Sequence, residues 1–151
     1  MHRGRWRETS RTMEAGYRIL DHPADLGVEA RGNTLAETLE QAACGLMSVI
    51  VDPDSVRLVE SRTVKIEAGD HQQLLVRWLT EVLYLYDGLK FVPRVFKIGR
   101  VSSHLLEARV RGEPFDRLRH SVRLDVKAIT YHQLEIRKRR SGHWLQVFLD
   151  I

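Results

Sequence analysis

The stretch Asp21-His22-Pro23-Ala24-Asp25-Leu26-Gly27 places a group of polar side chains between two apolar runs, Tyr17 to Leu20 and Leu26 to Ala30. Pro23 lacks a backbone N–H and biases the residue before it toward extended geometry, so we expect a fixed corner between two strands. The two aspartates and the histidine of this corner can bind a hard cation, act as an acid/base pair, or hydrogen-bond the loop to itself. The corner alone does not choose between these roles.

The composition is that of one soluble globular domain: 151 residues, 43% hydrophobic and 29% charged. No apolar run approaches the roughly 18 residues that a membrane helix needs, so we expect no membrane contact. A net charge of +4, from 24 basic and 20 acidic residues, permits an acidic partner but is not a polycation. The single cysteine, Cys44, excludes an intrachain disulfide and a multi-cysteine metal cluster, and no neighbouring histidine marks it as a nucleophile.

Residues 1–16 are rich in arginine and contain almost no aliphatic side chains. They have neither the apolar segment of a secretory signal nor the acid-poor composition of a transit peptide. We therefore predict a flexible basic arm, either a solvated leader or an RNA-contacting tail, ahead of a folded domain spanning residues 17–151.

Two amphipathic helices are predicted. The first begins at the capping box of Thr34 and Glu37, carries apolar residues every three or four positions, and ends before Asp52-Pro53. On a helical wheel Cys44 falls opposite this apolar stripe, so we do not expect it in the core. The second begins after Asp70 and ends at Gly88, where we expect a left-handed residue.

Alternating or apolar runs bounded by turn residues predict strands, and they occupy most of the remaining chain. These strands are expected over residues 27–32, 56–68, 92–98, 104–111, 122–131, 134–138 and 144–149, with hairpin connections at 99–103 and 139–142. After the turn at 112–116 comes a basic run, Arg117, Arg119, His120 and Arg123, which suits phosphate or an acidic partner and equally a solvated loop.

The apolar run at the end of the chain, Phe148-Leu149-Asp150-Ile151, continues to the last residue, which indicates that this end is docked. If it docks beside the corner, then Asp25, Asp150 and the main-chain oxygen of Ile151 form an oxygen-rich pocket. Ca²⁺ and Mg²⁺ take such ligands, whereas zinc prefers nitrogen and sulfur. Spacing alone does not show that the two ends meet.

Four motifs resemble the archease family and occur in that family's order. They are the corner at 21–27, the turn Gly112-Glu113-Pro114-Phe115-Asp116, the run Val126-Lys127-Ala128-Ile129-Thr130-Tyr131-His132, and the terminal Asp150-Ile151. The resemblance spans about residues 17–151 and leaves the basic arm outside. Pro23 stands where the family more often has Thr, and Arg123 stands where Lys is common; neither difference removes a carboxylate.

The resemblance implies an α+β fold, a single compact domain in which two amphipathic helices pack on a mainly antiparallel sheet as a two-layer sandwich. It also implies a cytoplasmic accessory protein, not an enzyme, that activates an RtcB-type RNA ligase in tRNA splicing or RNA repair. Such a protein promotes guanylylation and multiple turnover of the ligase and meets RNA only through it. The implied metal, usually calcium with Mg²⁺ or Mn²⁺ as alternatives, is held at the positions of Asp25, Asp150 and the backbone oxygen of Ile151.

Three further residues are candidates for the surface that faces the partner: Lys127, His132 and His22. Lys127 is suited to holding phosphate and His132 to moving a proton, but five residues apart on a strand they should point to opposite faces. His132 is equally a candidate for a structural hydrogen bond. Two other functions remain open: a stand-alone metal-dependent hydrolase using Asp25 with His22, and an RNA-binding or chaperone-like module.

Overall fold

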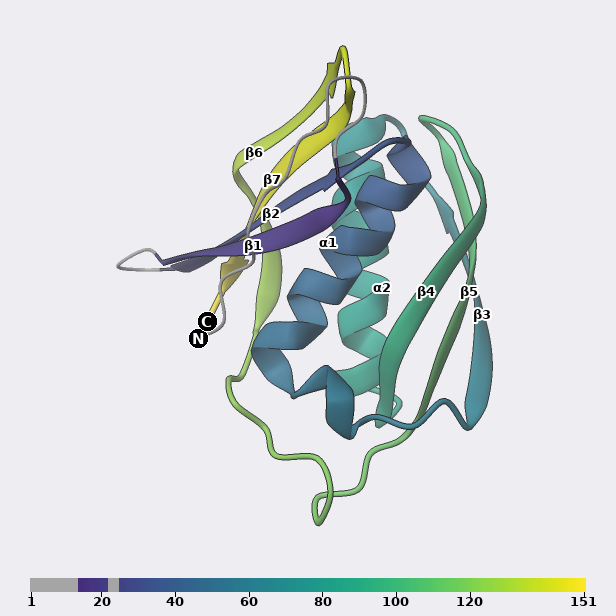
Figure 1. Cartoon of the computed structure of the whole chain (residues 1–151), viewed down its shortest axis with the longest axis vertical. Coiled ribbons are helices and arrows are strands. Elements are labelled where there is room, and N and C mark those ends of the chain that lie inside the picture. The colour runs from purple at the N-terminus through teal and green to yellow at the C-terminus, as the bar shows by residue number, and fades with distance from the viewer. Residues whose placement is uncertain (1–13, 22–24) are drawn as a thin grey trace.

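A pair of helices lies between two antiparallel sheets in the computed structural model, which describes residues 14–21 and 25–151 (Figure 1). The strands are β1 (Gly16–Asp21), β2 (Asp25–Gly32), β3 (Glu60–Glu67), β4 (Phe91–Val101), β5 (Leu105–Pro114), β6 (Ala128–Arg139) and β7 (Gly142–Asp150). The helices are α1 (Leu35–Ile50), α2 (His71–Asp87) and the short 3-10 helix η1 (Pro53–Ser55). The predicted arm, residues 1–16, therefore falls for the most part outside the described residues.

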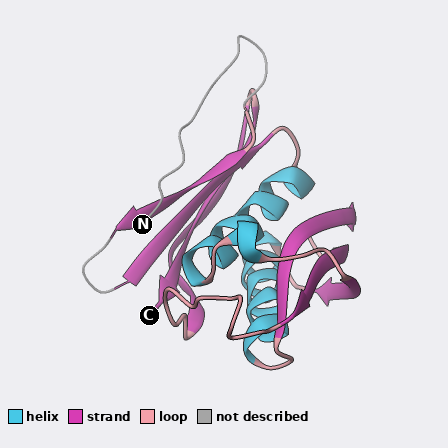
Figure 2. Ribbon diagram, turned by 60° about the horizontal axis from the view of Figure 1, so that its bottom comes forward, coloured by secondary structure: helices cyan, strands magenta, loops and turns pink. Residues whose placement is uncertain are grey.

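One sheet has the strand order β1-β2-β7-β6 and the other has the order β3-β5-β4. Helix α1 contacts β2 in the first sheet and β4 in the second, and α2 contacts β6 and β4, so the helices form the middle layer (Figure 2). The expectation of two helices packed on antiparallel sheet is confirmed. The structure differs from the expected two-layer sandwich in one respect: the strands divide into two sheets, one on each side of the helix pair, so there are three layers.

Both helices begin at the capping residues that the sequence predicts. The Thr34 hydroxyl accepts a hydrogen bond from the Glu37 N–H at 3.1 Å, and the Glu37 carboxylate accepts one from the Asn33 N–H at 3.1 Å. Asp70 accepts from the Gln73 N–H at 2.8 Å in the same way at the start of α2. These bonds satisfy backbone donors that a helix leaves unpaired in its first turn, which explains why the predicted starts are correct.

The core is centred on Trp78 of α2, whose side chain is fully buried. Its indole N–H donates to the Leu39 carbonyl of α1 at 2.9 Å, and its ring meets Phe96 of β4 edge-on, with 6.0 Å between ring centroids. One side chain thus links both helices to the second sheet.

Within the described residues, neither helix has the length and apolar content needed to cross a membrane.

The end of α2 differs from expectation. Gly88 has helical backbone angles, with φ at −87°, and its N–H donates to the Tyr84 carbonyl at 2.8 Å. The left-handed residue is Lys90, with φ at 56°. The prediction of a left-handed Gly88 is therefore wrong, because the helical hydrogen bonding continues through that residue.

The predicted strand at 122–131 forms only from Ala128, where β6 begins and then includes the predicted run 134–138. Residues before it are used to close the end of α1: the Arg123 N–H donates to the Ile50 carbonyl at 2.7 Å, and its guanidinium donates to the Ser48 carbonyl at 3.1 Å. The last carbonyls of a helix need such donors. Strand β6 is itself irregular between Thr130 and Glu135, where its register with β7 shifts.

Replacing the central tryptophan tests this account of the core. Trp78→Ala should lower the free energy of unfolding by about 4 kcal/mol, because it leaves a large cavity between both helices and β4. Denaturant unfolding followed by circular dichroism measures the effect. Tyr84→Ala on the same helix, where the side chain is half exposed, should cost no more than about 0.5 kcal/mol. Equal losses in the two variants would contradict the central role of Trp78.

Candidate functional site

The first residue of β2 and the last residue of β7 are both aspartates, and they lie directly opposite each other. The register of the β2–β7 ladder pairs Asp25 with Asp150. Side chains of directly opposed residues lie on the same face of a sheet, about 5 Å apart at Cβ. Asp25 is half-buried, with its Oδ1 atom inside the protein, and Asp150 is exposed. The structure thus brings together two carboxylates that are far apart along the chain.

Strand β6 completes this end of the sheet. Ala128 pairs with Asp150 across the β6–β7 ladder, and the Lys127 N–H donates to the Asp150 carbonyl at 2.8 Å. The exposed residue Lys127 therefore lies next to the pair Asp25 and Asp150. Because the Asp150 carbonyl already accepts a hydrogen bond, the next main-chain oxygen at this end is that of Ile151, which is 39% exposed.

The chemistry of these groups fits a hard cation, since all the donors are oxygens. Two carboxylates held side by side also repel each other unless positive charge lies between or beside them. Within residues 14–21 and 25–151, no group of three or more His, Cys, Asp and Glu side chains gathers in a metal-binding arrangement. The roles of Asp25, Asp150 and Ile151 as metal ligands stay predictions.

The two histidine candidates are placed differently. His22 belongs to the segment 22–24, which lies outside the described residues. His132 is exposed within the irregular part of β6, where its N–H donates to the Thr130 hydroxyl at 3.2 Å. It lies at most about 13 Å along the strand from Ala128. The alternation argument that separated it from Lys127 does not apply, because the register of β6 with β7 shifts between Thr130 and Glu135, the stretch that contains His132.

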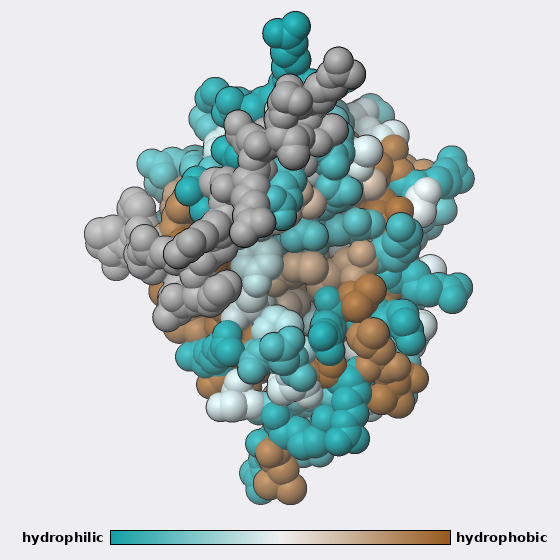
Figure 3. Space-filling view, in the orientation of Figure 1, coloured by the Kyte–Doolittle hydropathy of each residue, from teal (hydrophilic) through white to brown (hydrophobic). Residues whose placement is uncertain are grey.

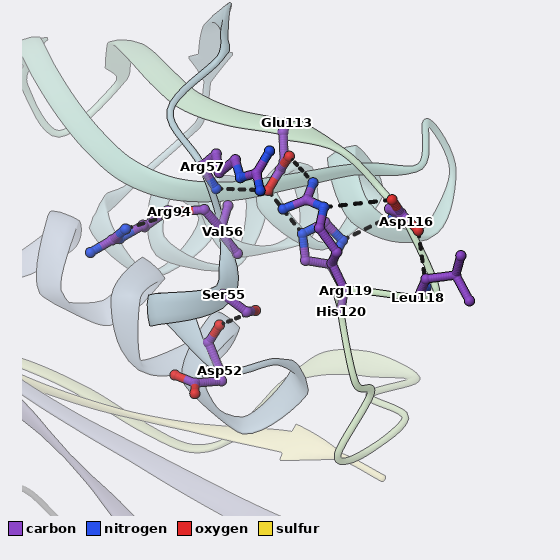
Figure 4. A network of polar contacts seen from close by, with 10 residues as sticks. All are labelled: Asp52, Ser55, Val56, Arg57, Arg94, Glu113, Asp116, Leu118, Arg119 and His120. Atoms are coloured by element: carbon purple, nitrogen blue, oxygen red, sulfur yellow. Dashed lines mark hydrogen bonds and ion pairs between the residues drawn. The ribbon is translucent and has the colours of Figure 1, made fainter.

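A second polar site, which the sequence analysis did not identify, is built around Glu113 near the end of β5 (Figure 4). Glu113 and His120 are 3% and 1% exposed, and their carboxylate and Nε2 atoms are 3.0 Å apart. Glu113 also accepts a hydrogen bond from the Arg57 N–H at 2.7 Å. Because the Asp116 N–H donates to His120 Nδ1 at 2.9 Å, the imidazole must accept there, and Nε2 is the nitrogen that donates to Glu113.

Arg119 completes the compensation of this buried charge. Its guanidinium forms an ion pair with Glu113, and this bond, together with the Arg57 N–H and His120, holds the pKa of Glu113 at about 2 despite burial. Glu113 and Asp116 in turn raise the pKa of Arg119. The site fastens the long connection between β5 and β6 to the segment before β3.

Three residues of the basic run bind groups of this same chain. Arg119 and His120 bind Glu113, and Arg123 binds the end of α1. The sequence allowed phosphate, an acidic partner or a solvated loop for this run; in the fold its acidic contact lies within the chain, at Glu113, and Arg123 is exposed. The sequence offered one signal for this site: the carboxylate of Glu113, in the turn seven positions before His120.

Cys44 fits its predicted chemical role but not its predicted position. It packs partly buried against the core, although the helical pattern placed it opposite the apolar stripe of α1. Burial raises the pKa of its thiol to about 11. The thiol is protonated at neutral pH, which agrees with the expectation that Cys44 is not a nucleophile.

Glu113→Gln tests the buried ion pair. The carboxyl pKa is lowered from about 4.5 to about 2 on folding, so its contribution is fully present above pH 4.5 and is lost as the pH falls toward 2. At pH 7 the variant should lose about 2–3 kcal/mol of unfolding free energy, and this difference should shrink across that acidic range. Denaturant unfolding at several pH values measures both.

The control for this experiment is Glu60→Gln, which removes an exposed ion pair with Arg62. It should change stability by less than about 1 kcal/mol at every pH. A Glu113→Gln variant that matched this control would show that the buried contacts do not stabilise the fold.

Comparison with known proteins gives one consistent result. The sequence profile of the Archease protein family matches residues 17–151. Protein archease of Thermococcus gammatolerans is 39% identical over 132 residues, covering 85% of this chain and 93% of the relative, and that of Methanosarcina barkeri is 34% identical over 139 residues, covering 89% and 95%.

The solved structures include a similar fold. The solution structure of protein 1598 of Methanobacterium thermoautotrophicum superimposes with a TM-score of 0.74 at 33% identity, covering 90% of this chain and 99% of that one. Sequence and fold agree over nearly the same span. The chain belongs to the archease family.

Proposed function

We propose that this chain is an accessory protein of an RtcB-type RNA ligase and acts in the cytoplasm, in tRNA splicing or RNA repair. It promotes guanylylation of the ligase, so that the ligase turns over repeatedly, and does not itself join RNA. The observation that carries the proposal is the direct pairing of Asp25 with Asp150 at one end of the β2–β7 ladder.

The proposed ligands of a divalent cation, calcium or another hard ion, are the carboxylates of Asp25 and Asp150 and the main-chain oxygen of Ile151. Calcium takes six to eight oxygen ligands, so these groups would leave positions for water or for an oxygen of the partner. A cation would also relieve the repulsion between the paired carboxylates. A bound divalent cation stabilises negative charge on phosphate oxygens.

The protein itself contributes the fixed positions of the charged groups. Asp25 and Asp150 begin and end strands of one ladder, so the backbone hydrogen bonds of the sheet hold both carboxylates at a set spacing. Lys127 is tied to the same point by its N–H bond to Asp150, and its exposed ammonium can contact a phosphate of the ligase or its nucleotide. Stabilising the transition state by about 1.4 kcal/mol more than the ground state raises the reaction rate about tenfold.

Asp25→Asn and Asp150→Asn test the proposed site separately. Each should weaken calcium binding by more than about tenfold, since even the outer-shell partners of a metal contribute 10–100-fold. Calorimetric titration measures binding, and the calcium-dependent rise in melting temperature should shrink in parallel. In a ligation assay with excess RNA, each variant should reduce stimulation of turnovers after the first.

The matched control is Asp54→Asn, which neutralises an aspartate whose side chain is 91% exposed and lies on η1. It should bind calcium and stimulate the ligase as the unaltered chain does. Normal stimulation by both site variants would exclude the metal-site role. Turnover of a small phosphorylated substrate in the absence of ligase would favour the hydrolase alternative instead.

A further inference from the structure

The β6–β7 hairpin ends in four consecutive cationic residues, Arg137, Lys138, Arg139 and Arg140, and all four are exposed. This end of the hairpin extends past the helices (Figure 1), and the described surface there is hydrophilic (Figure 3). The turn packs closely on the Gly32 backbone, because Gly142 has φ at 140° and a Cβ at its position would clash with the Gly32 carbonyl oxygen. The basic hairpin, residues 137–140, is thus a projecting and well-anchored element.

Two of its guanidinium groups are ordered by an aromatic ring. The guanidinium carbons of Arg137 and Arg139 lie 6.0 and 5.5 Å from the ring centroid of Trp144. The ring is itself fixed, because its N–H donates to the buried Glu29 at 2.7 Å. Side chains that are already ordered lose less conformational entropy when they bind a ligand.

The charge of the basic hairpin is poorly compensated. Arg137 forms an ion pair with Glu135 at 3.1 Å. Among the residues that the structure describes, no ion pair joins Lys138, Arg139 or Arg140 to an acidic side chain. Burial lowers the pKa of the neighbouring His143, and Lys138 and His71 add to that effect, as expected where positive charges gather.

We propose that the basic hairpin is a direct RNA-binding element that contacts phosphates without reading sequence. Arginine forks bind phosphate oxygens in pairs, and strand alternation places Lys138 on the face opposite Arg137 and Arg139. A ribbon that is cationic on both faces fits between rows of phosphates. An acidic protein segment would be expected to need apolar anchors at its binding site, and residues 137–140 offer none.

The basic hairpin and the pair Asp25 and Asp150 lie at opposite ends of the same sheet, so the distance between the two sites can be stated. Strand β7 runs from the basic hairpin to Asp150, a span of about 27 Å at strand rise. With Asp25 and Asp150 at the ligase, the hairpin would meet the RNA at that distance from its reacting ends. The binding step extends the proposed function but is measurable without the ligase.

Lys138→Gln combined with Arg140→Gln tests the inference and leaves both guanidinium groups beside Trp144 in place. The probes are fluorescently labelled RNAs of one length, a single strand and a hairpin duplex, titrated with the full chain at 50 to 200 mM salt. Loss of two phosphate contacts should weaken single-strand binding about tenfold or more at 100 mM salt. The plot of log binding constant against log salt concentration should become less steep by about 1.4.

The charge-matched control is Lys65→Gln with Lys97→Gln, two exposed lysines on the other sheet. It should bind RNA within about twofold of the unaltered chain, since net charge alone contributes weakly. An equal loss in both double variants, no loss in the hairpin variant, or equally tight binding of polyglutamate would each overturn the inference. Because no ligase is present, failure of ligase stimulation would sink the proposed function without altering this result.

Discussion

The antiparallel pairing of β2 with β7 is the contact on which the rest of this structure depends. It joins the two ends of the described chain, from Asp25 opposite Asp150 to Gly32 opposite His143. The entropic cost of closing so long a loop grows only slowly with length, and the burial of residues such as Val28 and Val147 against the helices offsets it. Strands β1 and β6 then extend the same sheet on either side.

This ladder also gives the sheet two chemically different ends. At one end it brings two carboxylates into direct opposition; at the other it supports a hairpin with four consecutive cations. Neither arrangement is required for a stable core, since both groups lie at the margins of the sheet. Charged residues held at set positions on rigid strands at the margin of a sheet are suited to binding something else.

Glu113 shows the contrasting case of a carboxylate that the fold compensates completely. It is buried, but the Arg119 guanidinium, the Arg57 N–H and His120 surround it with donors, and its pKa is lowered to about 2. Asp25 lies opposite a second carboxylate, that of Asp150, at the margin of the sheet. The same chemical type of side chain therefore has a structural role in one place and is a ligand candidate in the other.

Much of the local structure was predictable from the sequence, because its causes are local. Thr34 and Asp70 mark the helix starts by hydrogen bonds to residues three positions away, and the hairpin turn at 139–142 depends on Gly142. Residues 122–127 were not predictable in this way. Their alternating pattern suits a strand, but the N–H and guanidinium of Arg123 donate to the carbonyls of Ile50 and Ser48 at the end of α1, a contact between distant parts of the chain.

By itself, the sequence determined the two amphipathic helices, most of the strands, and the supply of carboxylates and cations at particular positions. Only the tertiary structure decided which of those charges are neighbours. Residue spacing carries no information about contacts between β2 and β7, so the meeting of Asp25 with Asp150 and the burial of Glu113 beside His120 had to come from the fold. The physical reason is that strand pairing and burial depend on packing of the whole core, whereas capping and turns depend on a few adjacent residues.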